Sequence, residues 1–257
     1  MDQFGHTVRR FLAMDKAAAL RELAKRRQAC KLQGYTKPYN QIGDYHGGVY
    51  ECDQVSPYTK SACNLDANVM VFLQDWSCDE SLRGPVKPER VSLGYTPTKR
   101  TNVTLIELLR QHLELRLSDT YATNVFPFIK RGSANAAIPR RDLELAAHEF
   151  GLPQLIIVRP KIAVCLGLST FKALRAACGQ DKVQRIAEAI AAPFCHQETV
   201  VFCQAHTSQQ GQNTRNRLDK RQVHKDWSKM ALCYRNMPAD RAETCTWFPE
   251  WWVMQAG

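Results

Sequence analysis

The sequence predicts an α/β fold, a three-layer α/β/α sandwich with a central, mostly parallel four-stranded sheet. Four short apolar runs alternate with amphipathic stretches of helical spacing, which is typical of parallel sheets covered by helices. The 257 residues, 44% of them hydrophobic, contain no repeat and no low-complexity linker. We therefore expect a single domain over residues 1–257, with an N-terminal helix and loop at 1–66 and an aromatic tail at 237–257.

The strands are predicted where short apolar runs are bounded by polar residues, as in the segment NVMVFLQ. Such runs are consistent with strands that are buried on both faces of a sheet. The four predicted strands span residues 68–74, 120–126, 161–166 and 198–204.

Helices are predicted where apolar residues recur at every third or fourth position. Proline is favourable in a first turn, so one helix begins after Pro139 and runs to about Glu149. Leu155–Val158 is a candidate extension of this helix after a break at Gly151–Pro153. The other predicted helices span 6–30, 102–117, 168–178 and 218–236. Segments rich in Gly, Pro and polar residues predict loops at 31–66, 76–101 and 205–217.

Composition favours a soluble protein with a polyanionic partner. Lys and Arg total 35 against 25 Asp and Glu, which gives a formal net charge of +10, and clustered cations bind polyanions by releasing counterions. There is no signal peptide and no apolar stretch of the roughly 20 residues that span a bilayer. The ten cysteines form no C-x-x-C pair, and several lie in apolar runs typical of buried thiols. We expect a reduced, cytoplasmic, monomeric protein.

Polar side chains follow the predicted strands at the edge where ligands bind in open α/β sheets. Asp75 follows the first strand, Asn124 lies at the end of the second, and His206 follows the fourth. A carboxylate that stabilises a cation, an amide that reads a pyrimidine edge and an imidazole that stabilises an oxyanion suit cleavage of an N-glycosidic bond. Each alone also fits a cap, a turn or a surface histidine, but their coincidence favours a site.

Several segments, taken in order, resemble the motifs of the uracil-DNA glycosylase superfamily. VFLQDWS (71–77) resembles its first motif, and TNVFPF (123–128) resembles the strand whose Asn reads the base. VRPKIAVCLG (158–167) is similar to a strand typical of the family, and QAHTS (204–208) resembles its His-Pro-Ser motif. LRELAKRRQACKL (20–32) is similar to the opening helix of the iron–sulfur branch.

The resemblance implies a role for each matching position. Asp75 orients a water and stabilises the sugar cation, and His206 hydrogen-bonds the oxygen of the departing base. Asn124 recognises the flipped base, whereas Tyr95 either stacks on it or packs its own loop. The implied catalytic residues are Asp75 and His206, and the implied substrate-binding residues are Gln74, Trp76, Tyr95 and Asn124.

The sequence departs from the family pattern at several positions. Trp76 stands in place of the Pro of the uracil-specific branch, and Ser77 in place of the Tyr that excludes the thymine methyl group. Thr207 replaces the usual Pro after the histidine. Cys30 has no C-x-x-C partner, because Gln33 occupies that position. We therefore expect no iron–sulfur cluster, no other metal and no cofactor.

The polar, basic segment after His206 is the predicted DNA contact, because the family fills the vacated base position from this loop. The resemblance implies DNA as the partner, with cations of this segment on phosphates. Lys99, Arg100, Lys130 and Arg131 are expected on the same face. The predicted DNA-binding residues are Ser208, Gln209, Gln210, Gln212, Asn213, Arg215 and Arg217.

The implied activity is that of a monofunctional DNA glycosylase of base-excision repair. Such an enzyme flips a nucleotide and hydrolyses the N-glycosidic bond of uracil or a modified pyrimidine, leaving an abasic site. Trp76 and Ser77, which replace the Pro and the thymine-excluding Tyr of the uracil-specific branch, and the long 76–101 loop leave open a second substrate, a bulky, hypermodified phage base. Its removal would give the protein a role in antiviral defence. A non-catalytic binder of DNA or abasic sites is a further interpretation. A small-molecule nucleotide hydrolase is disfavoured, because the sequence has no G-x-x-x-x-G-K-[ST] loop.

Overall fold

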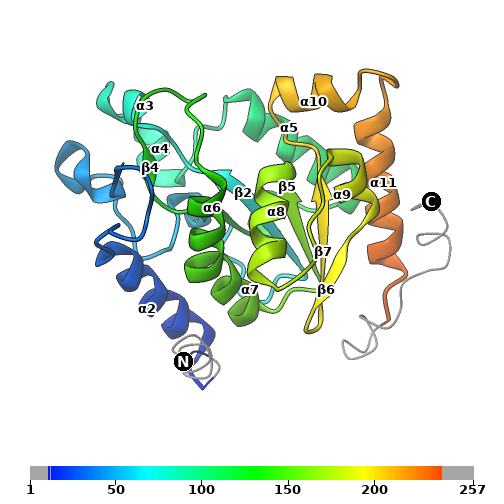
Figure 1. Ribbon diagram of the computed structural model, residues 1–257, viewed down its shortest axis with the longest axis horizontal. Helices are drawn as coiled ribbons and strands as arrows, with labels where there is room; N and C mark the ends of the chain where they lie inside the picture. Colours follow the sequence, from blue (N-terminus) through cyan, green and yellow to red (C-terminus); the bar gives the residue numbers. More distant parts are fainter. Residues whose placement is uncertain (1–10, 12, 239–257) are drawn as a thin grey trace.

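A mixed, mostly parallel sheet of five strands lies at the centre of the α/β fold (Figure 1). The computed structural model describes residue 11 and residues 13–238. The sheet order is β3-β2-β5-β7-β6. The strands are β2 (Val69–Asp75), β3 (Tyr121–Phe126), β5 (Ile162–Leu166), β6 (Phe194–His196) and β7 (Thr199–Gln204).

The predicted number of strands is wrong by one. The four predicted strands correspond to β2, β3, β5 and β7, but β6 adds a fifth that pairs antiparallel with β7 at the edge of the sheet. Its three residues are too few to produce a recognisable apolar run. The turn between β6 and β7 is tight, with Gln197 at a φ of 51°.

The other four strands run parallel, so their carboxyl ends share one edge of the sheet. β2 pairs with β3 on one side and with β5 on the other, and β5 pairs with β7. In this register Leu73 lies beside Asn124, and Leu166 lies beside Gln204. The residues that follow β2 and β7 therefore meet at the edge that lies at the top of Figure 1.

The predicted break at Gly151–Pro153 is wrong. α6 (Arg140–Ala146) continues through a π-helical turn (Ala147–Gly151) directly into α7 (Leu152–Val158). Pro153 lacks the N–H that a regular helix would use, and the wider turn accommodates it. The other long helices are α2 (Lys16–Gln28), α5 (Arg100–Leu108) with a π turn at Leu109–Leu113, α8 (Leu168–Ala177) and α11 (Gln222–Arg235).

Helices cover both faces of the sheet because side chains alternate along each strand. Met70 and Phe72 of β2 belong to an apolar cluster that includes residues of α6, α7 and α8. Val71 and Leu73 belong to a second cluster, with residues of α5 and α11. Figure 1 shows α6 and α8 on one face of the sheet and α11 beside it. Phe72 is fully buried, which contributes about 3 kcal/mol to stability.

Several segments that were predicted as loops contain short helices. The 76–101 segment holds α3 (Asp79–Arg83) and α4 (Pro88–Leu93), and the 205–217 segment holds α10 (Gln209–Arg215). A further helix, α9 (Ile186–Ala191), was not predicted. These helices have five to seven residues, too few for a periodic apolar pattern to stand out.

The segment between α2 and β2, which was predicted as a loop, contains a short strand and several 3-10 turns. β1 (Tyr39–Asn40) pairs with β4 (Ile129–Lys130), and three 3-10 turns follow at Ile42–Asp44, His46–Gly48 and Pro57–Ser61. The fully buried Arg27 of α2 attaches this segment to the helix through a two-point ion pair with Glu51. Among the described helices, none is long and apolar enough to cross a membrane. Of the aromatic tail predicted at 237–257, residues 239–257 lie outside the described residues.

Candidate active site

A cavity of about 530 Å³ opens at the carboxyl edge of the sheet, beyond the ends of β2 and β7. Its walls come from the end of β2, the segment from α3 to the start of α5, the turn after β4, and the chain that leads into α10. The sequence-predicted residues in its lining are Gln74, Asp75, Trp76, Tyr95, His206, Ser208, Gln209 and Gln210. The structure therefore gathers the predicted carboxylate and imidazole around one space.

Asp75 is the last residue of β2, and both of its carboxylate oxygens are held. The side-chain amide of Gln74 donates to Oδ1 at 3.1 Å, and the ammonium of Lys130 lies 3.1 Å from Oδ2. The Asp75 side chain is only 15% exposed, so its orientation is fixed by these partners within the cavity wall. Each carboxylate oxygen keeps a further lone pair that can accept from a water.

Lys130 is a site residue that the sequence did not assign to the cavity. It was expected on a DNA-facing surface, but its side chain is 7% exposed and points toward Asp75. Its ammonium also donates to the carbonyl of Ala134 at 2.6 Å. The pairing of β4 with β1 places Lys130 here, and a two-residue strand leaves no sequence signal. The ion pair gives the partly buried carboxylate of Asp75 a counter-charge, which offsets part of the cost of its burial.

His206 lies two residues beyond β7, and its tautomer is set by the backbone. The N–H of Ser208 donates to Nδ1 at 3.1 Å, so in the neutral ring the proton lies on Nε2. Burial lowers the pKa of His206. The positive charges of Lys99 and Lys130 lower this pKa further, whereas the negative charge of Asp75 raises it. At neutral pH the ring is therefore uncharged and offers an N–H donor.

α10 packs so closely on His206 that one of its positions must be glycine. A Cβ at Gly211 would lie 2.3 Å from the carbonyl oxygen of His206 and 2.9 Å from its Cβ. Gln212 of the same helix donates from Nε2 to that carbonyl at 3.0 Å. The Ser208 hydroxyl caps α10 by accepting from the Gly211 N–H at 3.2 Å. The position of His206 thus depends on the start of α10.

Trp76 forms a fixed wall of the cavity. Its indole N–H donates to the carbonyl of Gly94 at 2.6 Å, its ring contacts the edge of Tyr50, and the guanidinium of Arg90 lies 6.0 Å from its centroid. Gly94 has a φ of 77°, and a Cβ there would lie 1.7 Å from the carbonyl oxygen of Pro57. Glycine is therefore required where the helix α4 ends and Trp76 is anchored.

Tyr95 follows that anchor and also lines the cavity. Its ring lies 5.4 Å from the ring of Tyr58, with an interplanar angle of 36°. Tyr58 is buried and donates its hydroxyl to the side chain of Asn102, whose amide in turn donates to the carbonyl of Thr96. Tyr95 therefore packs against Tyr58, whose own position is fixed by its hydrogen bond to Asn102, and part of the Tyr95 side chain lines the cavity.

Asn124 does not line this cavity, contrary to the sequence-based expectation. It is fully buried in β3, and its Oδ1 accepts a hydrogen bond from the hydroxyl of Ser56 at 2.6 Å. Within the described residues its Nδ2 has no hydrogen-bond partner. The segment around the Pro57–Ser61 turn covers this side of β3, which the sequence did not reveal. Asn135, an exposed amide after β4, lines the cavity instead.

The predicted DNA-contacting residues divide into two groups. Ser208, Gln209 and Gln210 line the cavity, whereas Gln212 and Asn213 lie in the wall of a neighbouring groove. Arg215 is not free to meet a phosphate, because its guanidinium makes a two-point ion pair with Asp226 of α11 at 2.6 and 3.0 Å. Arg217 is exposed in the turn that follows α10.

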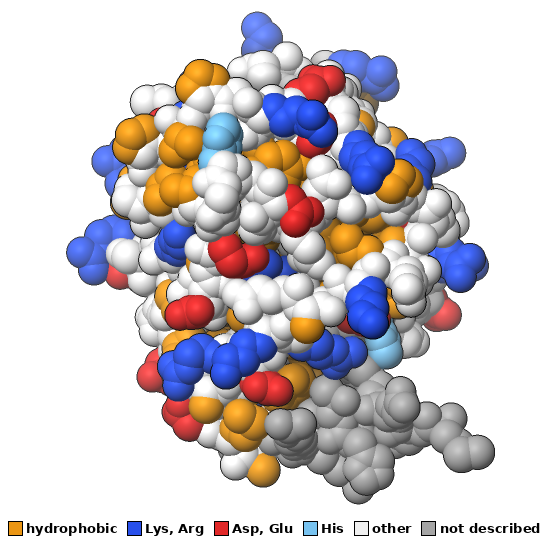
Figure 2. Space-filling model, turned by 90° about the vertical axis from the view of Figure 1, so that its left-hand side faces the viewer, with side chains coloured by type: hydrophobic (Ala, Val, Ile, Leu, Met, Phe, Trp, Pro, Cys, Tyr) orange, Lys and Arg blue, Asp and Glu red, His pale blue; other side chains and the backbone are white. Residues whose placement is uncertain are grey.

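The balance of positive and negative side chains differs between the cavity edge and the face that carries α2, α3 and α4 (Figure 2). On the side that carries α2, α3 and α4, Lys and Arg side chains are interspersed with Asp and Glu (Figure 2). The cavity edge differs, since Lys99, Lys130 and Arg90 line it together with a single carboxylate, Asp75. A polyanion would therefore gain more at the carboxyl edge of the sheet than on the face in Figure 2.

Comparisons with known proteins add no assignment. No protein-family model matches the sequence, and no curated protein matches it significantly. In the part of the chain that the structure describes, no group of three or more His, Cys, Asp and Glu side chains is arranged to hold a metal ion.

Proposed function

We propose that the protein is a DNA glycosylase that hydrolyses the N-glycosidic bond of uracil or a modified pyrimidine in a flipped nucleotide. The single observation that carries the proposal is the presence in one cavity of Asp75 and of His206, whose ring is oriented by the Ser208 N–H. The proposal includes membership of the uracil-DNA glycosylase superfamily, with the helices on the two faces of the sheet as the outer layers of a three-layer sandwich.

His206 supports departure of the base. As the bond between C1′ and the base nitrogen breaks, its electron pair leaves with the base and builds negative charge on a pyrimidine oxygen. The Nε2–H of a neutral imidazole stabilises that charge by hydrogen bonding, and burial makes such a bond stronger than in water. The hydrogen bond from Ser208 to Nδ1 keeps the donor on Nε2 throughout.

Asp75 supports the sugar. Loss of the base leaves C1′ with oxocarbenium character, which a nearby carboxylate stabilises by electrostatic attraction. Asp75 also accepts a hydrogen bond from the attacking water, whose oxygen bonds to C1′ while one proton leaves to the carboxylate or the departing base. The contacts from Gln74 and Lys130 hold the carboxylate in place, so that it needs no reorganisation during the reaction.

The base itself is proposed to lie against Tyr95, between Trp76 and the Gln209 side of the cavity. A ring on the cavity surface offers a stacking face for an extruded base. With Asn124 shielded by Ser56, we assign polar recognition of the base to two of the amides that line the cavity, Gln74 and Asn135.

The size of the cavity favours a second candidate substrate. A volume of about 530 Å³ lies within the range of roughly 300–1,000 Å³ that holds drug-sized ligands, so a pyrimidine alone leaves space unfilled. Trp76 is tied back to Gly94 and does not close this space. A base with a bulky substituent, such as a glycosylated hydroxymethylcytosine, is therefore the alternative substrate.

Mass spectrometry of defined oligonucleotides tests both candidates. The protein is incubated with strands that carry one uracil, one 5-hydroxymethylcytosine or its glucosylated form, and an unmodified strand serves as the control. The proposal predicts a free base and an abasic strand from at least one modified substrate. Release from the glucosylated strand alone selects the bulky-base candidate. Bound but intact strands in every case would leave the non-catalytic binder and contradict the proposal.

A further inference from the structure

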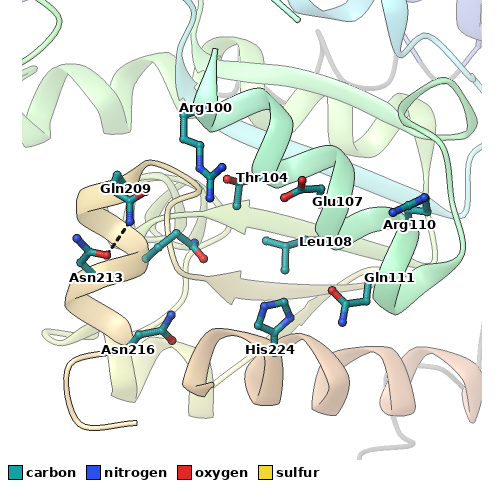
Figure 3. A pocket seen from close by; sticks show the side chains of 11 residues that line it. Arg100, Thr104, Glu107, Leu108, Arg110, Gln111, Gln209, Asn213, Asn216 and His224 are labelled. Atoms are coloured by element: carbon teal, nitrogen blue, oxygen red, sulfur yellow. Dashed lines mark hydrogen bonds between the residues drawn. The ribbon is translucent and has the colours of Figure 1, made fainter. Parts of the chain in front are cut away.

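A second, larger cavity adjoins the candidate active site. It has a volume of about 650 Å³ and lies in a groove between α5, α10 and α11, which we call the α5–α10 groove (Figure 3). Gln209 lines both this groove and the catalytic cavity. Lys99 lines the catalytic cavity, and its neighbour Arg100 lines the groove. The two spaces are therefore adjacent along one edge of the sheet.

The groove carries positive charge and hydrogen-bonding groups above a small apolar floor. Arg100 extends into it from the start of α5, opposite Gln209 and Asn213 of α10 (Figure 3). Gln209 donates to Oδ1 of Asn213 at 2.7 Å, which leaves the Nδ2 hydrogens of Asn213 as donors. The buried Leu108 supplies the floor.

The opposite wall of the groove is rigid. His224 of α11 faces the groove (Figure 3). Its Nδ1 is hydrogen-bonded to Nε2 of His112 at 3.1 Å. Asn216 is held by the Val223 N–H, which donates to its Oδ1 at 2.9 Å. The groove is thus bordered by side chains that are already oriented before any ligand binds, which lowers the entropic cost of binding.

The charges are distributed along the groove. Glu107 is seven residues after Arg100 on the same helical segment, so the two positions are about 10 Å apart along the helix axis. An anionic group is therefore favoured at the Arg100 end, beside Asn213, whereas at the other end the charge of Glu107 is accompanied by that of Arg110, three residues later. The Arg100 end is also the end shared with the catalytic cavity through Gln209.

We propose that the α5–α10 groove binds the nucleotide next to the flipped one in the same DNA strand, with its phosphate on Arg100 and Asn213 and its base over Leu108. This inference rests on the proposed function, because it is the strand entering the catalytic cavity that delivers the neighbouring nucleotide. Amide and guanidinium donors suit phosphate oxygens, and an apolar floor suits the face of a base. The groove makes single-stranded DNA longer than one nucleotide the preferred ligand.

Fluorescence anisotropy with labelled oligothymidylates of two, six and twelve nucleotides tests the inference without requiring catalysis. The variant is Arg100→Gln, and the matched control is Arg26→Gln, an exposed arginine on α2 far from this edge of the sheet (Figure 1). We expect Arg100→Gln to bind the twelve-mer about fivefold more weakly and to lower the salt slope by about 0.7. Its gain in affinity from two to six nucleotides shrinks, whereas the control matches the wild type.

The outcomes separate the inference from the proposed function. An Arg100→Gln variant with wild-type affinity, salt slope and length dependence would overturn the inference that the α5–α10 groove binds DNA, even if the wild type releases bases normally. Failure of the wild type to bind any oligothymidylate would overturn it as well. If binding depends on Arg100 but no modified strand loses its base, the groove stands as a DNA-binding site and the glycosylase proposal fails.

Discussion

Replacing Gly211 by alanine should lower the rate of base release by about 10²-fold in a protein that still folds. The added Cβ would lie 2.3 Å from the carbonyl oxygen of His206, whereas ordinary contacts begin at 3.4 Å. Relief of this overlap requires a shift of about 1 Å between α10 and His206, and a displacement of that size costs about 10²-fold in rate. Overpacking of this kind costs about 1–3 kcal/mol. The preference of a helix for alanine over glycine, up to about 1 kcal/mol, offsets part of that cost, so the melting temperature should fall by only a few degrees.

The assay is single-turnover base release from the modified strand that the wild type processes, together with thermal unfolding of each variant. Gly84→Ala is the matched control, because its Cβ would meet only the Ser81 carbonyl oxygen, at an ordinary 3.8 Å. We expect Gly84→Ala to react like the wild type. A Gly211→Ala variant with the wild-type rate would refute the conclusion that α10 positions His206 for the reaction.

Three other predictions follow from side-chain contacts in and beside the cavity. Lys130→Met removes the partner of the partly buried Asp75 carboxylate, so denaturant unfolding should show a free energy of unfolding about 3 kcal/mol lower, which Asp75→Asn in the same chain largely restores. Losses in free energy that simply add in the double variant would contradict the pairing. Burial holds the pKa of His206 below its ordinary value of 6.5, so kcat/KM should fall on the acid side with a midpoint below pH 6.5. The folded state then binds fewer protons than the unfolded chain, so the contribution of His206 to stability is present above pH 6.5 and is lost as the pH falls through the lowered pKa; activity that increases toward low pH would argue for an imidazolium instead. Arg215→Leu should lower the free energy of unfolding by about 3 kcal/mol, because it leaves Asp226 buried without its partner, and should not change the salt slope of DNA binding; a changed slope with normal stability would place Arg215 on phosphate.

The sequence predicts the strands far better than it predicts the segments that complete the cavity. β2, β3, β5 and β7 are buried apolar runs, so their positions and the polar residues that follow them can be read directly. Asp75 and His206 are found for this reason, because a parallel sheet brings the ends of its strands together. Local patterns therefore suffice where the chemistry lies at the end of a strand.

The rest depends on contacts between segments that are distant in the sequence. Lys130 reaches Asp75 because it pairs with Tyr39 of β1, some ninety residues earlier in the chain, and forms a parallel bridge with Cys78. Asn124 is shielded by Ser56, which is 68 residues away in the sequence. Arg215 lies among other cations that were expected to face DNA, and only its ion pair with Asp226 shows that it serves the packing of α10 on α11. No spacing rule within one segment reveals these pairings.

The most direct test of the central claim is the rate of abasic-site formation by Asp75→Asn. The substrate is the modified strand that the wild type processes, and Asp66→Asn, an exposed aspartate paired with Lys16, is the matched control. Loss of the carboxylate charge should reduce the rate by about 10³-fold while Asp66→Asn reacts normally. An Asp75→Asn protein that forms abasic sites at the wild-type rate would show that this carboxylate takes no part in the chemistry.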